Sequence, residues 1–306
     1  MTNTRRAASV SLDLDNHWAS LRTHGDEAWR DFPSYLSVAA PRIGEFFSEI
    51  GVKPTIFVVG KDLELDDGRE TVSSFAQLGY EIANHSDNHR ADFHSLDEHE
   101  ITTEITSCAQ KIASLIGKKP VGFRGPSFQI SEKIAKILIT EGYRYDASSY
   151  PTSIGPLARA YHLFHAKLTP AEKHEQRHLF GGFRSAFAPL ELHRWDVGGN
   201  SIVEIPVTTM PLARLPIHFT YLNFLADKSE TLAFAYLNFA LILLRATGVK
   251  PSLLLHATDF LGCDDSPIPK FLPGMKRPHK DKIKFLSRIF SRFEKYYEFS
   301  GLGTLI

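Results

Sequence analysis

The 306-residue sequence is poor in cysteine and has no excess of charge of either sign. Its two cysteines, Cys108 and Cys263, stand far apart and outside any Cys-x-x-Cys pattern. This argues against a disulfide framework or a thiolate zinc site and favours free cytosolic thiols. With 35 basic and 35 acidic residues the formal net charge is zero. No global positive field attracts nucleic acid, so we expect no nucleic-acid partner.

Several common functional motifs are absent as well. There is no Gly-x-Ser-x-Gly elbow, and Ser127 follows a proline in an unrelated turn, so a serine hydrolase lacks support. No glycine-rich dinucleotide-binding loop or Walker loop occurs, and we find no internal repeat or low-complexity tract.

Signals for a membrane span or for export are also missing. The uncharged, largely apolar segment 231–244 has 14 residues, fewer than the roughly 20 that a spanning helix needs. We expect a buried barrel helix there, with docking at a membrane interface as the alternative. Residues 1–8 contain no apolar h-region. We therefore expect a cytoplasmic protein whose membrane contact, at the inner face, is at most peripheral.

Short apolar runs alternate with segments of helical period, as in βα units. We expect strands over 8–15, 54–59, 78–83, 201–206 and 252–255, and another that begins at 121 and stops at Arg124. We expect helices near 35–50, 69–78, 97–116 and 131–141. The pattern predicts an α/β fold, and a barrel of this size can form one domain over residues 1–306.

Two segments stand apart from this alternation. Residues 151–200 have weak periodicity and exceed an ordinary βα connection, so we interpret them as an insertion over the barrel mouth. Residues 280–298 predict a basic C-terminal helix that covers the barrel. Contact of its basic outer face with anionic lipid or phosphate remains an alternative.

Four expected strands end in residues that carry chemistry: Asp13, Asp15, His85, His89, Arg124, His256 and Asp259. If residues 85–89 begin a helix, the four-residue spacing puts both imidazoles on one face, within reach of a single metal ion. Barrel enzymes assemble their sites at the carboxyl ends of strands. The sequence therefore predicts one functional site at this end.

In order and spacing, segments 8–16, 85–89, 121–128 and 252–259 resemble the motifs of the NodB-homology polysaccharide deacetylases, carbohydrate esterase family 4. The resemblance spans roughly residues 8–260. It implies a distorted (β/α) barrel, which we expect to have seven strands, and a divalent metal, usually zinc. It also implies removal of N-acetyl groups from amino sugars. A cytoplasmic relative is expected to act on a glycan precursor, for example a nucleotide-linked or lipid-linked sugar.

The resemblance also assigns roles. Asp15, His85 and His89 become metal ligands, Asp13 the general base and His256 the general acid, which are the groups that amide hydrolysis needs. Zinc suits this ligand set, while iron, cobalt, nickel and manganese remain open. The family's adjacent carboxylates are here separated by one residue, although strand alternation still points both to one side. A swap of roles between the two therefore stays open.

Other residues are expected to orient the site or to bind substrate. Arg124 would pair with Asp13, or serve only as a core ion pair, and Asp259 would orient His256. Four residues are expected at the substrate: Pro126, Phe128, Leu254 and Trp195. The first two shape a turn and Leu254 lines a small acyl pocket. Trp195 stacks on sugar, with simple packing as its alternative.

Two other functions remain alternatives. Related enzymes deformylate lipid-linked amino sugars, so the acyl group is open between acetyl and formyl. A carbohydrate-binding barrel without turnover is the second, but a binder needs neither the base Asp13 nor the acid His256. The sugar, its linkage and the oligomeric state are not predicted.

Overall fold

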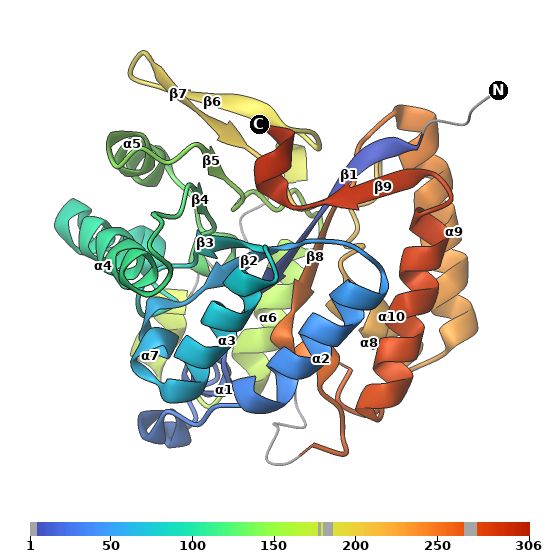
Figure 1. Cartoon of the computed structure of the whole chain (residues 1–306), viewed down its shortest axis with the longest axis horizontal. Coiled ribbons are helices and arrows are strands. Elements are labelled where there is room, and N and C mark those ends of the chain that lie inside the picture. Colours follow the sequence, from blue (N-terminus) through green and yellow to red (C-terminus); the bar gives the residue numbers. More distant parts are fainter. Residues whose placement is uncertain (1–4, 177–178, 180–185, 266–273) are drawn as a thin grey trace.

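The computed structural model describes residues 5–176, 179, 186–265 and 274–306. At its centre is one curled sheet surrounded by helices (Figure 1). Within the described residues its strands are β1 (Arg6–Asp13), β2 (Thr55–Val58), β3 (Glu81–Asn84), β4 (Gly122–Phe123), β5 (Tyr145–Asp146), β6 (His193–Val197), β7 (Asn200–Glu204), β8 (Ser252–His256) and β9 (Tyr297–Ser300).

Seven of these strands form the barrel. In the order β7-β5-β4-β3-β2-β1-β8, all neighbours pair in parallel. β6 extends the sheet as an antiparallel partner of β7, and β9 lies beside the first half of β1. β7 and β8 are not paired, although the backbone N–H of Thr208 donates to the carbonyl of Ser252 at 3.0 Å. The expected distorted (β/α) barrel is confirmed.

The helices are α1 (His17–Thr23), α2 (Leu36–Glu49), α3 (Asp66–Gln77), α4 (Glu98–Ile116), α5 (Glu132–Thr140), α6 (Gly155–His165), α7 (Pro170–Glu175), α8 (Phe219–Ala226), α9 (Glu230–Thr247) and α10 (His279–Phe293). α2 to α5 confirm the four helices expected from periodicity. The capping residues explain such boundaries. α4 begins at a capping box made by Asp97 and Glu100 and ends at Gly117, whose φ of +70° suits glycine.

Both faces of the parallel strands are buried, which explains their continuous apolar runs. In β2, Ile56 and Val58 belong to the large core beneath the outer helices. Phe57 lies between them and packs in a separate cluster with Tyr145 and Leu302. Alternate residues of one strand therefore pack on opposite sides of the curled sheet.

The C-terminal segment differs from its prediction. The basic helix expected over 280–298 ends at Phe293, and residues 297–300 form β9 against the first residues of β1. Tyr297 and Phe299 are buried, with the exposed Glu298 between them. This is the alternation of a strand. Tyr297 follows Phe293 at a helical spacing, which made a longer helix equally compatible with the sequence.

Two other boundaries also differ. β3 begins at Glu81 and not near residue 78, because the chain turns at Gly79, with a φ of +77°, after α3. The expected insertion at 151–200 contains α6, α7 and β6, while residues 177–178 and 180–185 lie outside the described part. Lys167 donates its backbone N–H to the carbonyl of His24 at 2.9 Å, just after α1. The insertion thus borders the end of the barrel at which β1 stops.

Candidate active site

The strand register brings the predicted residues to one rim of the barrel. Asp13, the last residue of β1, is paired with His256 at the end of β8. Asn84 ends β3 and is paired with Phe123 at the end of β4, so that His85 and Arg124 follow side by side. Because all these strands are parallel, their carboxyl ends open on the same side.

Two carboxylates and two imidazoles converge there. The Oδ1 of Asp15 lies 3.2 Å from the Nε2 of His85 and 3.5 Å from the Nε2 of His89. The Oδ2 of Asp13 lies farther away, at 3.9 Å from the Nε2 of His85. Both imidazoles are buried, whereas the Asp15 side chain is 21% exposed. Solvent therefore reaches the cluster on the Asp15 side.

The imidazole of His85 is held in one orientation. Its Nδ1 lies 2.7 Å from the backbone carbonyl oxygen of Arg124. Since a carbonyl only accepts, Nδ1 donates, and the Nε2 of the neutral ring presents a lone pair toward Asp15.

The charges of the cluster depend on one another. Burial alone would raise the pKa of Asp15, but the attraction of His89 and the close contact with His85 hold it well below its usual range. Burial lowers the pKa of His89. For His85, burial acts in the same direction, yet the charge of Asp13 and the contact with Asp15 outweigh it and raise the pKa. An ionised Asp15 and a neutral His89 are the forms that ligate metals.

The predicted helical turn over residues 85–89 is wrong. The segment is an irregular loop in which Ser86 and His89 have left-handed φ values of 64° and 47°. Two such turns bring the rings of His85 and His89 within 5.0 Å of each other, centroid to centroid. The four-residue spacing was informative, but a helix is not what joins the two residues.

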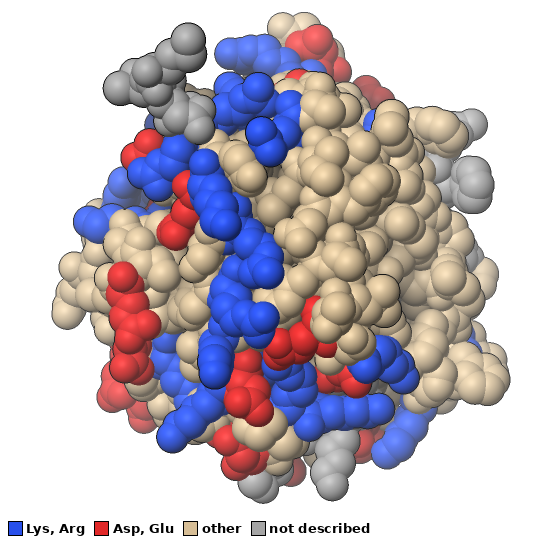
Figure 2. Space-filling view, turned by 90° about the vertical axis from the view of Figure 1, so that its right-hand side faces the viewer, with Lys and Arg blue, Asp and Glu red and all other residues tan. Residues whose placement is uncertain are grey.

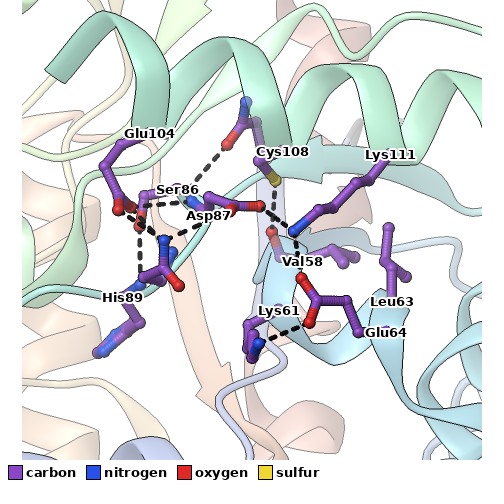
Figure 3. Close-up of polar contacts among 12 residues, drawn as sticks. Val58, Lys61, Leu63, Glu64, Ser86, Asp87, His89, Glu104, Cys108 and Lys111 are labelled. Atoms are coloured by element: carbon purple, nitrogen blue, oxygen red, sulfur yellow. Dashed lines mark hydrogen bonds and ion pairs between the residues drawn. The ribbon is translucent and has the colours of Figure 1, made fainter. Parts of the chain in front are cut away.

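Glu104 on α4 holds this loop (Figure 3). Its Oε2 accepts from the backbone N–H groups of Asp87 and Asn88, at 3.1 and 2.8 Å. Lys111, two turns further along α4, donates to Asp87 at 2.7 Å. The sequence analysis missed Glu104. The sequence feature that could have identified it is a carboxylate in the otherwise apolar buried face of α4, between Ile101 and Ile105.

Arg124 lies beside Asp13. Its guanidinium is fully buried and donates through Nη1 to the Oδ1 of Asp13 at 2.5 Å, and through Nε to the carbonyl of Ala147 at 2.9 Å. It also stands over the ring of Phe57, 4.1 Å from its centroid. A charge-assisted hydrogen bond of this kind fixes the orientation of the carboxylate.

His256 is oriented through an intermediary. Its Nδ1 lies 3.0 Å from the hydroxyl of Thr220 on α8, and this hydroxyl lies 3.2 Å from both carboxylate oxygens of Asp259. Asp259 also accepts from the backbone N–H of His256 at 2.9 Å. Asp259 thus reaches the imidazole by way of Thr220, which the sequence analysis missed because no motif marks it.

An apolar wall continues from this histidine. Leu254, Tyr150 and Val207 form a buried cluster against which Phe128 packs. The rings of Phe128 and Tyr150 are 4.7 Å apart, and Pro126 opens the short helical turn that carries Phe128. The structure thus brings Pro126, Phe128 and Leu254 to one side of the site.

Trp195 does not join them. It lies on the edge strand β6, paired with Ile202 of β7, and packs partly buried against the cluster that includes Ile134 and Ile137 of α5. The location agrees with the packing alternative, and the sugar-stacking prediction has no support in these contacts.

Comparison with known proteins agrees with this geometry. A family model described as polysaccharide deacetylase matches residues 26–145. The peptidoglycan deacetylase-like protein FGM2 of Gibberella zeae is 29% identical over 145 residues, which cover 46% of this chain and 42% of that protein. The chain is therefore similar to polysaccharide deacetylases over less than half of its length. The match spans less than half the length of the curated relative.

The deacetylase fold is also found in solved structures. A Mycobacterium smegmatis protein assigned to the polysaccharide deacetylases superposes with a TM-score of 0.63 at 18% identity, covering 99% of this chain and 89% of that one. The Xyl-CE4 domain of a xylanase from the Trinervitermes trinervoides hindgut metagenome gives 0.49 at 13% identity, covering 99% and 90%. The first likeness shows a shared fold along nearly the whole chain.

The residues present fit the divalent metal that polysaccharide deacetylases commonly use. The Oδ1 of Asp15 is buried without a hydrogen-bond partner in the described part of the chain. Ligand atoms at about 2.0–2.2 Å from a tetrahedral zinc ion lie about 3.3–3.6 Å from one another. The separations of 3.2 and 3.5 Å from Asp15 to the two imidazoles match this spacing.

Proposed function

We propose that the protein is a metal-dependent hydrolase that removes the N-acetyl group from an amino sugar in a glycan or glycan precursor. The observation that carries the proposal is the convergence of Asp15, His85 and His89 beside an Arg124-bound Asp13. Similarity to polysaccharide deacetylases over residues 26–145 supports the same reaction class.

The surroundings of the two carboxylates support different roles. Asp15 is the one that lies near both imidazoles, which suits a metal ligand with His85 and His89. Asp13 has one oxygen bound to Arg124, and its other oxygen is directed toward the cluster. In this assignment Asp13 accepts the proton of the attacking water, so it is the general base.

His256 completes the proton transfers. Its Nδ1 donates to Thr220, which leaves Nε2 to give a proton to the departing amine as the general acid. A bound divalent metal, for which zinc is well suited, would polarise the amide carbonyl and lower the pKa of a water. The wall formed by Leu254, Tyr150 and Phe128 would accommodate a small acyl group.

The experiment is hydrolysis of N-acetylated oligosaccharides and sugar-lipid extracts by purified zinc-loaded protein, with acetate and formate measured together. We expect acetate release that Asp13→Asn lowers by at least about a hundredfold, the usual contribution of a general base. Formate in place of acetate would identify the deformylase alternative. Tight sugar binding in calorimetry with no product would identify a carbohydrate-binding barrel and contradict the proposal.

A further inference from the structure

The outer face of α9 is uncharged and largely apolar between Glu230 and Arg245. The exposed residues that recur at spacings of three and four are Leu232, Ala235, Phe239, Ile242 and Ala246. The three large side chains among them are 51%, 54% and 59% exposed, respectively. No charged residue occurs between Glu230 and Arg245. A helix on the surface of a soluble domain normally carries charged residues on this face.

The opposite face of α9 is firmly part of the fold. Phe234, Leu237 and Leu241 are buried in the large core, and the ring of Phe234 lies 5.0 Å from that of Phe285 on α10. By length and composition α9 is apolar enough to cross a membrane, but a third of its residues are buried inside the molecule. We therefore treat it as a helix fixed on the barrel, with one unpartnered face among the described residues.

A basic edge borders this face. The guanidinium groups of Arg288 and Arg292 on α10 lie over the ring of Phe234, 4.3 and 3.8 Å from its centroid. Lys284 continues the same stripe of α10, and Lys295 lies in the turn just after the helix ends; both side chains are exposed. Figure 2 shows basic side chains in a line beside a broad face without charge.

We propose that the surface formed by α9 and the basic stripe of α10 docks on an anionic lipid bilayer. An apolar helix face enters the interface between headgroups and acyl chains, and adjacent basic residues bind anionic headgroups. A second copy of the chain fits less well, because a symmetric contact would place the same basic edge near itself. Docking does not require that the protein catalyse the proposed reaction.

The surface is continuous with the candidate active site. α8 packs against α9, with the rings of Tyr221 and Tyr236 5.8 Å apart. Phe224 of α8 is 45% exposed, and one turn earlier Thr220 contacts His256. In a docked molecule, α8, which carries Thr220, therefore lies close to the bilayer.

Vesicle flotation of the full-length chain tests the proposal. We expect the protein to float with vesicles of phosphatidylglycerol and phosphatidylcholine at about 0.1 M salt and to bind pure phosphatidylcholine far more weakly. Phe239→Glu with Ile242→Glu should reduce binding by about tenfold or more. Lys284→Gln with Lys295→Gln should reduce it on the order of tenfold, for anionic vesicles alone.

Leu78→Glu is the matched control, because Leu78 is 40% exposed at the end of α3, outside the proposed docking surface. This substitution should leave vesicle binding unchanged. Circular dichroism verifies folding, and Phe239→Ser with Ile242→Ser provides a milder pair. Absence of vesicle binding, or binding that neither α9 pair reduces, would overturn the proposal. A dimer in sedimentation velocity that the same pairs dissociate, without vesicle binding, would also overturn it in favour of a second copy.

Discussion

Asp13 and Asp15 are separated by one residue, yet their contacts give them different chemistry. Asp13 is 3% exposed and bound by a buried guanidinium, whereas Asp15 faces two imidazoles and solvent. In His256 and Thr220, too, the contacts of a side chain decide its chemistry. The imidazole has one nitrogen fixed by a hydroxyl, so its other nitrogen is available to the substrate.

Thr220→Val should therefore impair the proposed acid without removing it. The substitution deletes the hydroxyl that accepts from His256 and keeps the side-chain volume. Loss of a hydrogen bond to the protonated imidazole costs about 1.5–3 kcal/mol, or about ten- to hundredfold in rate. We expect kcat to fall with KM nearly unchanged. Thr220→Ser should restore kcat, and equal losses of kcat in the two variants would refute the positioning role.

At the scale of elements, α1 is tied to the rim by one buried carboxylate. Asp62 accepts from the side chain of Asn16, at 2.9 Å, and from the indole of Trp18, at 2.7 Å. Asn16 caps α1 directly after Asp15. The contact keeps the turn between β1 and α1 in place and accounts for Trp18 as a packing residue. Burial raises the pKa of Asp62 from 3.8 to about 7.

This raised pKa predicts a pH dependence of stability. The folded state favours the protonated carboxyl, so the contribution of Asp62 is complete below about pH 4 and is lost as the pH rises toward 7. Asp62→Asn mimics the protonated form. We measure urea unfolding in the presence of a metal chelator. Between pH 4 and pH 8, the free energy of unfolding of the variant should rise by up to about 3–4 kcal/mol relative to the wild type. The exposed Glu45→Gln on α2 is the control, and parallel wild-type and Asp62→Asn curves would disprove the linkage.

The sequence predicted elements well where one periodicity decided them. α2 to α5 follow from amphipathic spacing, and β2 and β8 from short apolar runs. The loop at 85–89 was not predictable in this way. The two residues between its left-handed positions donate their backbone N–H groups to Glu104, which comes from a different element. Thr220 was missed for the same reason, since it reaches His256 from 36 positions away.

For the whole molecule, the parallel barrel explains why remote residues meet at all. The predicted site residues lie at or just after the ends of β1, β4 and β8, and in a parallel barrel these carboxyl ends all lie at the same rim. The pairing of β9 with β1 joins the two ends of the chain and could not be predicted from local pattern. Cytoplasmic location and a single domain over 1–306 stay predictions, and the exposed face of α9 indicates where membrane contact would occur.

The most direct test of the account is the zinc content of purified protein, stripped with chelator, reloaded and dialysed. We predict one tightly held zinc per chain, lost in Asp15→Ala, His85→Ala and His89→Ala. Asp13→Asn, at the same rim, should keep it. Mass spectrometry of the metal gives the number directly. Full zinc occupancy in His89→Ala, or its loss in Asp13→Asn with retention in Asp15→Ala, would contradict the proposed ligand set.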